Sequence, residues 1–422
     1  MKNKNAVLKI LAELCRLLIG VVFIFSGFVK AVDPMGGAIK IGEYLASFGL
    51  DMLQPFTVLL SFNLSAIEFA LGVCMLLGVY RRYVSFLILI FMAFMTPLTL
   101  YLALFDPVSD CGCFGDALVI SNWETFFKNI VLSLAAIVTF IYNQRLFQCF
   151  TFRAYWFVAL YAYLFGVGFA YYNYNHLPVI DFRPYKIGAN IPKLMEMPEE
   201  APQDEYKFVY EKDGVKKEFS LEDYPANDSS WTFVDSKTEL VKKGYQPPVA
   251  AFNIYNGKGD DVTEEIIGNP GPVLLLVAPK LEEADDEQMD EINGVYDYAL
   301  EHDIPFYCVT GSSPEAIDTW SDNTGAEYPF RMADEVLLKT IIRSNPGLVL
   351  LKGGTILGKW HYNDIPAEEE VKAVMDRCLD ESNIKSKEDG TLATNLLTFT
   401  VPLLLVWMYD LLRFRRKRKE KK

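Results

Sequence analysis

Two cysteines one residue apart, Cys111 and Cys113, are the side chains of this sequence best suited to chemistry. They belong to the segment 110–116, which reads Asp-Cys-Gly-Cys-Phe-Gly-Asp and connects two long apolar stretches. A thiolate is the active species in disulfide exchange. A bond between cysteines this close would close a small, strained ring, and strain makes a disulfide more reducible. Because Gly112 and Gly115 also leave room for a partner backbone, we expect the pair to cycle between dithiol and disulfide.

Acidic residues on both sides of the pair should influence its thiols. The negative charges of Asp110 and Asp116 are expected to raise the pKa of both thiols and to disfavour the thiolate, although either carboxylate could accept a proton during exchange. One alternative is a structural turn whose cysteines are idle or permanently bonded. A metal site is another, but two cysteines need further ligands, and only His176 is expected nearby. We therefore predict redox chemistry and no metal.

Glu68 lies in the middle of the apolar stretch 56–79, where a charged side chain is costly in a bilayer. One interpretation is a proton or quinone site between helices, which makes a quinone the candidate cofactor. The alternative is an ion pair that fixes helix packing, and Arg16 or Lys30 would then be the partner of Glu68.

Six apolar stretches reach the roughly 20 residues that a membrane-spanning helix needs: residues 8–31, 56–79, 83–105, 124–143, 154–175 and 392–412. Basic residues cluster before the first stretch, between the second and third, between the fourth and fifth, and after the sixth, in the tail 413–422. Under strict alternation all four clusters face one side, which the positive-inside rule identifies as the cytoplasm. We predict a multi-pass protein in the lipid bilayer of a bacterial inner membrane, with both termini cytoplasmic and residues 176–391 periplasmic.

Charge is distributed unevenly along the chain. Its total is −14 although 51% of its residues are hydrophobic. Residues 1–175 carry a net charge of +2, residues 176–391 carry −22 and residues 392–422 carry +6. An acidic soluble part argues against nucleic acid as a partner. The expected fold class is a multi-domain membrane protein, with an α-helical transmembrane bundle and an α/β extracytoplasmic domain.

Residues 248–380 show strands that alternate with helices and end in a hairpin and a helix, a pattern typical of an α/β sandwich. The preceding residues, 181–247, form a proline-rich linker with short strands at 207–210, 215–219 and 231–234 and a hairpin signal at Asp213-Gly214. A strand is expected at 251–255 and a helix at 282–301.

This domain resembles the thioredoxin fold, in its TlpA or peroxiredoxin-like branch. Pro346, the strand 348–351 and the glycines after it look like the cis-proline loop and hairpin of that family. The resemblance implies that the loop, Pro346 and Gly347 included, docks an extended partner segment by strand addition; a plain fold determinant is the alternative. The family's Cys-x-x-Cys position reads Ala-Pro-Lys-Leu-Glu at 278–282, so the domain lacks that redox pair. Cys378 is its remaining exchange candidate.

Residues 12–143 resemble the DoxX and MauE family of four-span membrane proteins, which implies a four-helix membrane domain over residues 1–145. The motifs that carry the resemblance are Arg16–Gly20, Ser26-Gly27, Lys30, Asp33-Pro34, Glu43–Leu45, Glu68 and Cys111–Gly115. The MauE branch carries the cysteine motif and is associated with periplasmic disulfide formation in partner proteins. The DoxX branch is associated with quinone-linked sulfur oxidation.

These features predict a thiol-disulfide or quinone-linked oxidoreductase. Electrons or disulfides would pass between the periplasmic Cys111/Cys113 pair and either the thiols of a partner protein or a quinone, while the domain at 248–380 holds the client. The alternative is a non-enzymatic membrane scaffold whose outer domain binds a periplasmic partner, and a transporter is a third possibility because of Glu68. Since an acidic domain faces the pair, we expect a slow or partner-activated relay rather than a stable thiolate.

Overall fold

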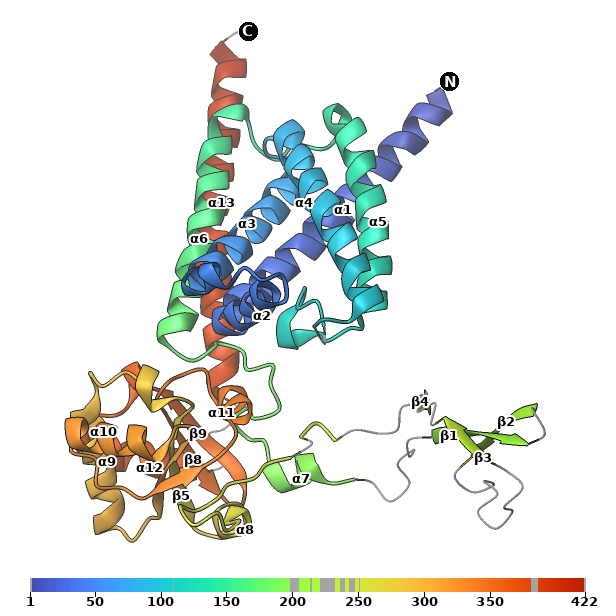
Figure 1. Ribbon diagram of the computed structural model, residues 1–422. Coiled ribbons are helices and arrows are strands. Elements are labelled where there is room, and N and C mark those ends of the chain that lie inside the picture. The colour runs from blue at the N-terminus through green and yellow to red at the C-terminus, as the bar shows by residue number, and fades with distance from the viewer. Residues whose placement is uncertain are drawn as a thin grey trace.

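The computed structural model describes residues 2–108, 110–197, 205–212, 215–220, 232–235, 240–242, 247–249, 251–380 and 386–420. A helical bundle stands above an α/β domain in Figure 1, and both described ends of the chain lie at the end of the bundle away from that domain. This arrangement agrees with the predicted topology, in which the termini and the outer domain lie on opposite sides of the membrane. The side that is cytoplasmic stays a prediction.

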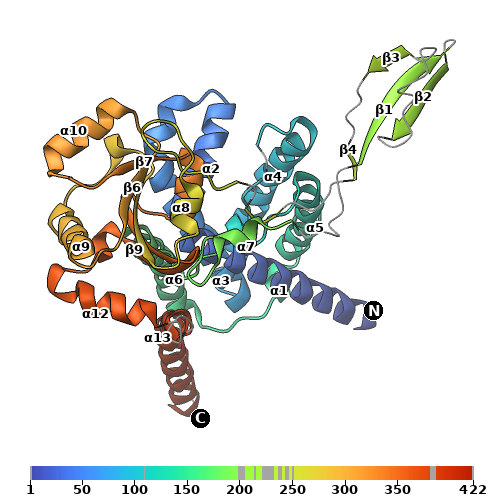
Figure 2. The ribbon, with the colours of Figure 1, turned by 90° about the horizontal axis from the view of Figure 1, so that it is seen from below.

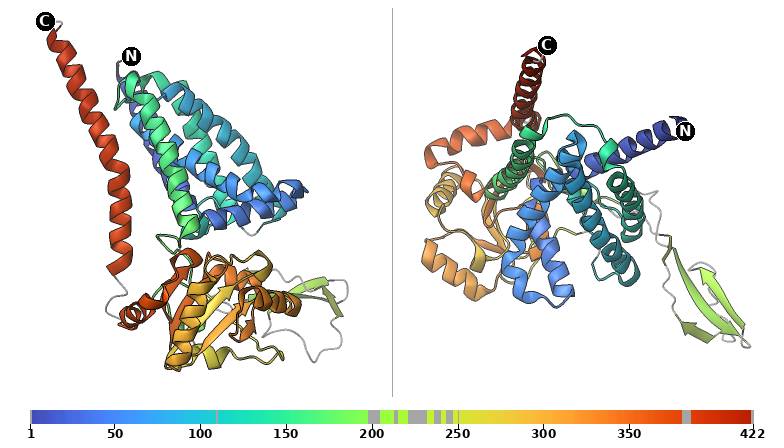
Figure 3. Two further views of the ribbon diagram at one scale, coloured as in Figure 1. Left: turned by 90° about the vertical axis from the view of Figure 1, so that its left-hand side faces the viewer. Right: turned by 90° about the horizontal axis from the view of Figure 1, so that it is seen from above.

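The bundle consists of long helices connected by short loops. They are α1 (Lys2–Val32), α3 (Thr57–Leu77), α4 (Arg81–Phe105), α5 (Asn122–Ile141), α6 (Tyr155–Asn175) and α13 (Ser386–Glu420). Helix α1 packs along α3, α4 along α5, and α3 along α6. Figure 3 shows α13 at the outside of the bundle. It is attached to α6 by a hydrogen bond from the Tyr161 hydroxyl to the Thr398 carbonyl, 2.6 Å, and by contacts of the Phe399 ring.

Five stretches of the described residues are helices long and apolar enough to cross a membrane: Asp51–Leu77, Arg81–Phe105, Asn122–Ile141, Phe152–Asn175 and Ala393–Arg413. They correspond to five of the six predicted spans, so the chain is a multi-pass membrane protein. The remaining predicted span, residues 8–31, lies within α1, which carries the charged side chains of Glu13 and Arg16 and packs along α3. Six spans therefore stay a prediction.

Helices α1 and α3 approach each other closely because each helix has a glycine that faces the backbone of the other helix. A Cβ atom on Gly27 would lie 2.4 Å from the Phe69 nitrogen, and one on Gly72 would lie 2.5 Å from the Ile24 nitrogen. Real Cβ atoms do not come this close to backbone, so any larger residue would push the two helices apart. This contact places the outer third of α1 directly against Glu68.

The outer end of the bundle is covered by a short helix between the first two predicted spans. Helix α2 (Pro34–Ser47) follows α1 after a break at Asp33, whose carboxylate accepts a hydrogen bond from the Gly36 amide, 2.8 Å, as an N-cap. The 3-10 helix η1 (Asp51–Phe56) then leads into α3. The cap turns the chain so that α2 lies across the end of the bundle rather than extending α1.

A five-stranded mixed sheet forms the centre of the α/β domain that was predicted at residues 248–380 and is called the outer domain here. Its strands, in spatial order, are β7 (Phe330–Met332), β6 (Phe306–Thr310), β5 (Pro272–Ala278), β8 (Gly347–Lys352) and β9 (Thr355–His361). Strands β5, β6 and β7 are parallel, whereas β8 and β9 are antiparallel to their neighbours. Alternate residues of β5 enter different cores, since Leu274 and Leu276 pack on one face and Leu275 and Val277 on the other.

Helices cover both faces of this sheet. Figure 2 shows α9 (Met289–Glu301), α10 (Pro314–Thr324) and α12 (Glu368–Leu379) on one side, and α7 (Ile191–Met195) and α8 (Thr263–Ile267) on the other. Helix α11 (Glu335–Ile341) also packs on the second face, through Leu338 and Ile341. The predicted α/β layering is therefore confirmed.

Two sequence expectations for this domain are wrong in detail. The predicted helix 282–301 begins only at Met289, because the Asp285 carboxylate accepts a hydrogen bond from the Glu287 amide in a turn and the Asp285 amide donates to the Asn345 carbonyl. The predicted strand 251–255 is reduced to isolated bridges at Tyr255. In the linker, β1 (Glu205–Lys212), β2 (Val215–Ser220) and β3 (Thr232–Asp235) match the predicted strands, β4 (Leu240–Lys242) joins them, and the Asp213-Gly214 turn lies outside the described residues.

Candidate functional site

The cysteine loop between α4 and α5 is folded back onto the bundle by polar contacts. The Tyr44 hydroxyl donates to the Cys111 carbonyl, 2.8 Å, and the Ser26 hydroxyl oxygen lies 2.7 Å from the Cys113 carbonyl oxygen. Gly112 has a φ of 65°, and a Cβ atom there would lie 2.8 Å from the Lys40 side chain. Glycine is therefore needed for both conformation and space.

The two sulfur atoms lie 3.0 Å apart, with Cys111 buried and Cys113 half-buried. The hydrogen bond from the Cys111 thiol to Cys113 lowers the pKa of Cys113 to about 6, and the ammonium groups of Lys128 and Lys30 act in the same direction. The same bond, together with burial, raises the pKa of Cys111. Within the pair, the thiolate is therefore favoured at Cys113 and the proton is retained at Cys111.

The expectation that the flanking acids disfavour the thiolate is wrong for Cys113. Asp110 is paired with Lys40 at 3.1 Å, and Asp116 is paired with Arg343 at 3.4 Å. Because both carboxylates have cationic partners, their charges are largely compensated at the pair. The raised pKa of Cys111 has other causes, namely its hydrogen bond and its burial.

Glu68 has a cationic partner in the bundle. Its carboxylate accepts hydrogen bonds from the Lys30 ammonium at 2.7 and 2.9 Å and from the Ser26 hydroxyl at 2.7 Å. The Lys30 alternative is therefore confirmed. The Arg16 alternative is wrong, because Arg16 pairs with Glu13 at 2.6 Å and donates to carbonyls at the end of α3. The Ser26 hydroxyl lies within hydrogen-bond distance of both Glu68 and the Cys113 carbonyl, and so connects this ion pair to the cysteine loop.

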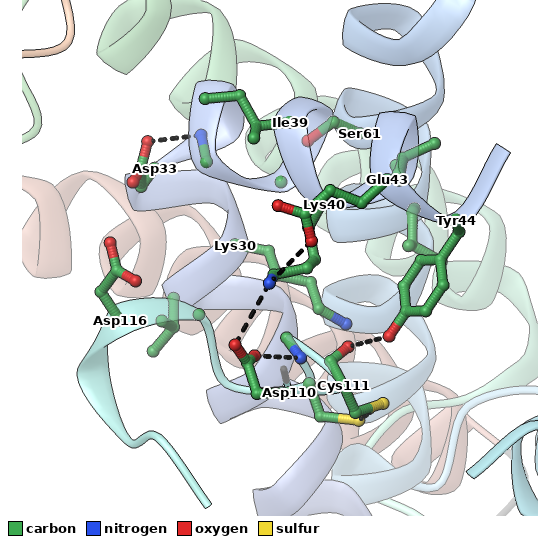
Figure 4. A pocket seen from close by; sticks show the side chains of 18 of the residues that line it. Lys30, Asp33, Ile39, Lys40, Glu43, Tyr44, Ser61, Asp110, Cys111 and Asp116 are labelled. Carbon is green, nitrogen blue, oxygen red and sulfur yellow. Dashed lines mark hydrogen bonds and ion pairs between the residues drawn. The ribbon is translucent and has the colours of Figure 1, made fainter. Parts of the chain in front are cut away.

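A cavity of about 650 Å³ brings most of the predicted site together. Figure 4 shows its polar end, where the cysteine loop, the end of α1 and helix α2 meet. The lining includes every residue predicted for chemistry in the membrane domain: Cys111, Cys113, Asp110, Asp116 and Glu68. The rest of the wall is mostly apolar and is supplied by Phe48, Leu64, Phe91, Phe94, Met95 and Leu98 among others.

The outer domain contributes a wall of this cavity that was not predicted from the sequence. Val336, Lys339 and Thr340 of α11 and Arg343 just after it line the space. The Arg343 guanidinium binds Asp33 at 2.9 Å. Although burial opposes it, this guanidinium holds the pKa of Asp33 below its ordinary value. A long-range partner of this kind leaves no local signal in the sequence, although Arg343 precedes the predicted loop at Pro346 by only three residues.

The residues predicted to bind a partner, Pro346 and Gly347, are both buried and do not line the cavity. The Asn345–Pro346 peptide bond is cis, as predicted. Gly347 is paired with Val277 on one side and with His361 on the other, and the Asn345 amide donates to the Lys280 carbonyl at 2.7 Å. The chain itself therefore occupies both flanks of this loop, and its role in partner binding stays a prediction.

The cysteines of the outer domain lie away from the cavity wall. Cys308 of β6 is completely buried in the core, and burial raises the pKa of its thiol. Cys378 of α12 packs against the core on the same face of the sheet. Neither residue lines the cavity that holds Cys111 and Cys113.

Comparisons with known proteins give two family matches and a weak structural likeness. Residues 204–243 match a domain of unknown function (DUF8463). No curated protein matches the chain. The solution structure of a putative protein disulfide isomerase from Bacteroides thetaiotaomicron matches 33% of this chain and 89% of its own, with 17% identity and a TM-score of 0.25. Residues 8–142, the part of the chain that carries Cys111 and Cys113, match the model of the methylamine utilisation protein MauE.

Proposed function

We propose that this protein is a thiol-disulfide redox protein of a bacterial inner membrane, in which Cys111 and Cys113 exchange electrons with the thiols of a periplasmic partner protein. The observation that supports the proposal best is the position of two sulfur atoms, 3.0 Å apart, in the wall of a large cavity. The MauE family match of residues 8–142 supports the same reading. A purely structural turn would not need an unbonded dithiol next to such a cavity.

The two cysteines have different roles in the proposed exchange. The Cys113 thiolate attacks a sulfur of a partner disulfide, which forms a mixed disulfide and releases a partner thiolate. The Cys111 thiol then loses its proton and attacks the Cys113 sulfur, which closes the Cys111–Cys113 bond and releases the second partner thiolate. Two electrons have passed to the partner, and the reverse sequence oxidises a partner dithiol. Cys113 is the attacking sulfur because it is the more exposed of the two and has the lowered pKa.

In the direction that oxidises a partner dithiol, the pair is left reduced, and a quinone in the cavity would be the electron acceptor that restores the Cys111–Cys113 disulfide. Its ring and tail would be held by the apolar wall, which includes Phe91 and Phe94, while the Tyr44 hydroxyl and the Lys30 ammonium stand at the polar end. A volume of about 650 Å³ falls within the usual range for small-molecule sites. When bound, the quinone would take up the two electrons and two protons that the dithiol loses on closing.

We further propose that the outer domain is a thioredoxin-like domain that serves the membrane dithiol. Its strand order, its antiparallel β8 and its cis-Pro346 are what the thioredoxin resemblance implies. It has no cysteine at 278–282, and its helix α11 lines the cavity instead. In this reading the domain covers the dithiol and guides the partner segment to it.

The test compares full-length wild-type protein with Cys111→Ser, Cys113→Ser and the double variant, using rapid thiol alkylation in cells. We expect the wild-type pair to change redox state with aeration, and Cys111→Ser to accumulate a mixed disulfide on Cys113 that dithiothreitol cleaves. Cys149→Ser, in a loop at the other end of the bundle, is the matched control and should behave as wild type. A pair that never changes redox state, with the same crosslinked partners in the double variant, would instead favour the scaffold.

A further inference from the structure

Lys128 is a charged residue inside the predicted membrane span 124–143. It has no role in the disulfide exchange proposed above. It lies in the second turn of α5, and its ammonium nitrogen stands 4.1 Å from the centre of the Phe114 ring. Phe114 directly follows Cys113 in the loop. A cation at such a position is costly, and it is usually kept because it faces a partner or a functional group. The contact of the Lys128 ammonium with the Phe114 ring offsets part of this cost.

The other cations around the cysteine pair already have carboxylate partners. Lys30 is paired with Glu68 at 2.7 Å, Lys40 with Asp110 at 3.1 Å and Arg343 with Asp33 at 2.9 Å. Among the side chains that the structure describes, no carboxylate lies within 4.0 Å of the Lys128 ammonium. The positive charge of Lys128 therefore lacks an anionic partner among these carboxylates.

A second, much smaller cavity gives Lys128 access to the dithiol. Its volume is about 30 Å³, which is room for about two water molecules. Its wall includes Lys128, Cys113, Phe114 and Asn129, together with Lys30 and Glu68. Lys128 and Cys113 therefore border the same small space, which shares Lys30, Glu68 and Cys113 with the wall of the large cavity.

We propose that Lys128 is the counter-ion of Cys113, a positioning residue that holds this cysteine as the attacking thiolate of the pair. The inference deepens the proposed function and rests on it for its use in redox exchange. It also explains why a lysine occupies this place in α5, because its charge is compensated when Cys113 ionises. The lowered pKa of Cys113 agrees with this pairing.

Other charged groups around Cys113 either raise or lower its pKa, and their effects partly cancel. The Lys30 ammonium from α1 favours the thiolate, whereas the Glu68 carboxylate that binds it acts against the thiolate. The ionisable groups around the loop are Lys30 of α1, Asp33 at the start of α2, Lys40, Glu43 and Tyr44 of α2, Glu68 of α3, Lys128 of α5, Lys339 and Arg343 at α11, and Asp110, Cys111 and Asp116 of the loop itself. Removal of Lys128 alone should therefore leave Cys113 with little net positive charge nearby.

The test is a titration of Cys113 in purified full-length protein. In a Cys111→Ser background, the rate of iodoacetamide modification of Cys113 is followed against pH by mass spectrometry. Lys128→Met should raise the midpoint of the profile by about one pH unit, as expected for the loss of a nearby opposite charge. Well below the midpoint, this shift corresponds to a rate about tenfold lower. Lys128→Arg keeps the charge and should keep the midpoint.

Arg145→Gln is the matched control, because the Arg145 guanidinium also stands over an aromatic ring, Tyr142, at the other end of α5. It should leave the profile unchanged. An unchanged midpoint in Lys128→Met, or an equal shift in Lys128→Arg, would overturn the inference. Folding should not obscure the result, since methionine is less costly in a membrane span than lysine. The titration needs no partner or electron acceptor, so its outcome is independent of whether the dithiol cycles in cells.

Discussion

The ion pair between Arg343 and Asp33 should control access to the dithiol, and Arg343→Gln tests this. The pair joins the outer domain to the end of the bundle, and its side chains are only 11% and 14% exposed. Removing one partner of a buried pair typically costs about 3–5 kcal/mol, because the other charge is left without compensation. The lower end of this range applies, since Asp33 keeps its hydrogen bond from the Gly36 amide.

The contact of Arg343 with Asp116 adds less, because the Asp116 side chain is 44% exposed and such pairs contribute at most about 1 kcal/mol. A loss of about 3 kcal/mol in the docked state corresponds to a change on the order of a hundredfold in the docking equilibrium. The domain would stay tethered by α6 and α13, so the expected result is an opened cavity rather than an unfolded protein.

The assay compares two maleimides of different size on the Cys111/Cys113 pair of the full-length protein. N-ethylmaleimide can enter the cavity of the docked protein, whereas a polyethylene-glycol maleimide reacts only when α11 moves away. Arg343→Gln should accelerate the bulky reagent by at least tenfold and the small reagent much less. Asp33→Asn should do the same without disturbing α2, because asparagine is also a good N-cap. Lys352→Gln removes a charge of the same domain that does not line the cavity, and it should change neither rate.

Equal rates of the bulky reagent in wild type, Arg343→Gln and Asp33→Asn would refute this reasoning. Such a result would mean that the domain covers the cavity through other contacts, or that it does not cover the cavity at all. An equal acceleration of both reagents would also count against it, because that pattern indicates a general change in thiol reactivity rather than a change in access.

Two further predictions concern the contact between α1 and α3. Gly27→Ala should separate these helices and lower the melting temperature in circular dichroism, whereas Gly168→Ala, where a Cβ atom has no neighbour within 4 Å, should not. Glu68→Gln should destabilise the bundle by about 3–5 kcal/mol, because it leaves the Lys30 ammonium buried without a counter-ion, while the double variant Lys30→Met with Glu68→Met should recover most of the loss. Denaturant unfolding in detergent measures this coupling, and additive effects of the two single changes would contradict the pairing.

The sequence was informative about which membrane residues meet, for a simple geometric reason. Cys111 and Cys113 lie in a short loop between two apolar stretches, so they must stand at one end of the bundle. The alternation of spans places the end of the first helix, with Lys30, at the same end. A buried Glu68 then needs a cation, and only a few were available.

The partners from other elements could not be predicted in this way. Tyr44, Lys128 and Arg343 reach the loop only because α2 crosses the bundle end, α5 presents its second turn and α11 docks from the outer domain. The same limit explains the error about thiol acidity. A count of charges along the chain includes Asp110 and Asp116 but not the cations that bind them, and the local field at Cys113 depends on those pairings.

The loop before β8 connects the two halves of the proposed mechanism. Asn345 binds the Lys280 carbonyl in the segment where a thioredoxin would carry its cysteines, and Arg343, two residues earlier, binds the bundle. The loop before β8 is thus held at two points, by Arg343 at the bundle and by Asn345 at the segment after β5. A movement of α11 away from the cavity would therefore displace this loop. In this protein the outer domain contributes a charge and a wall to the dithiol rather than a second pair of sulfurs. A partner that binds this loop would thus alter access to Cys113 without touching either cysteine.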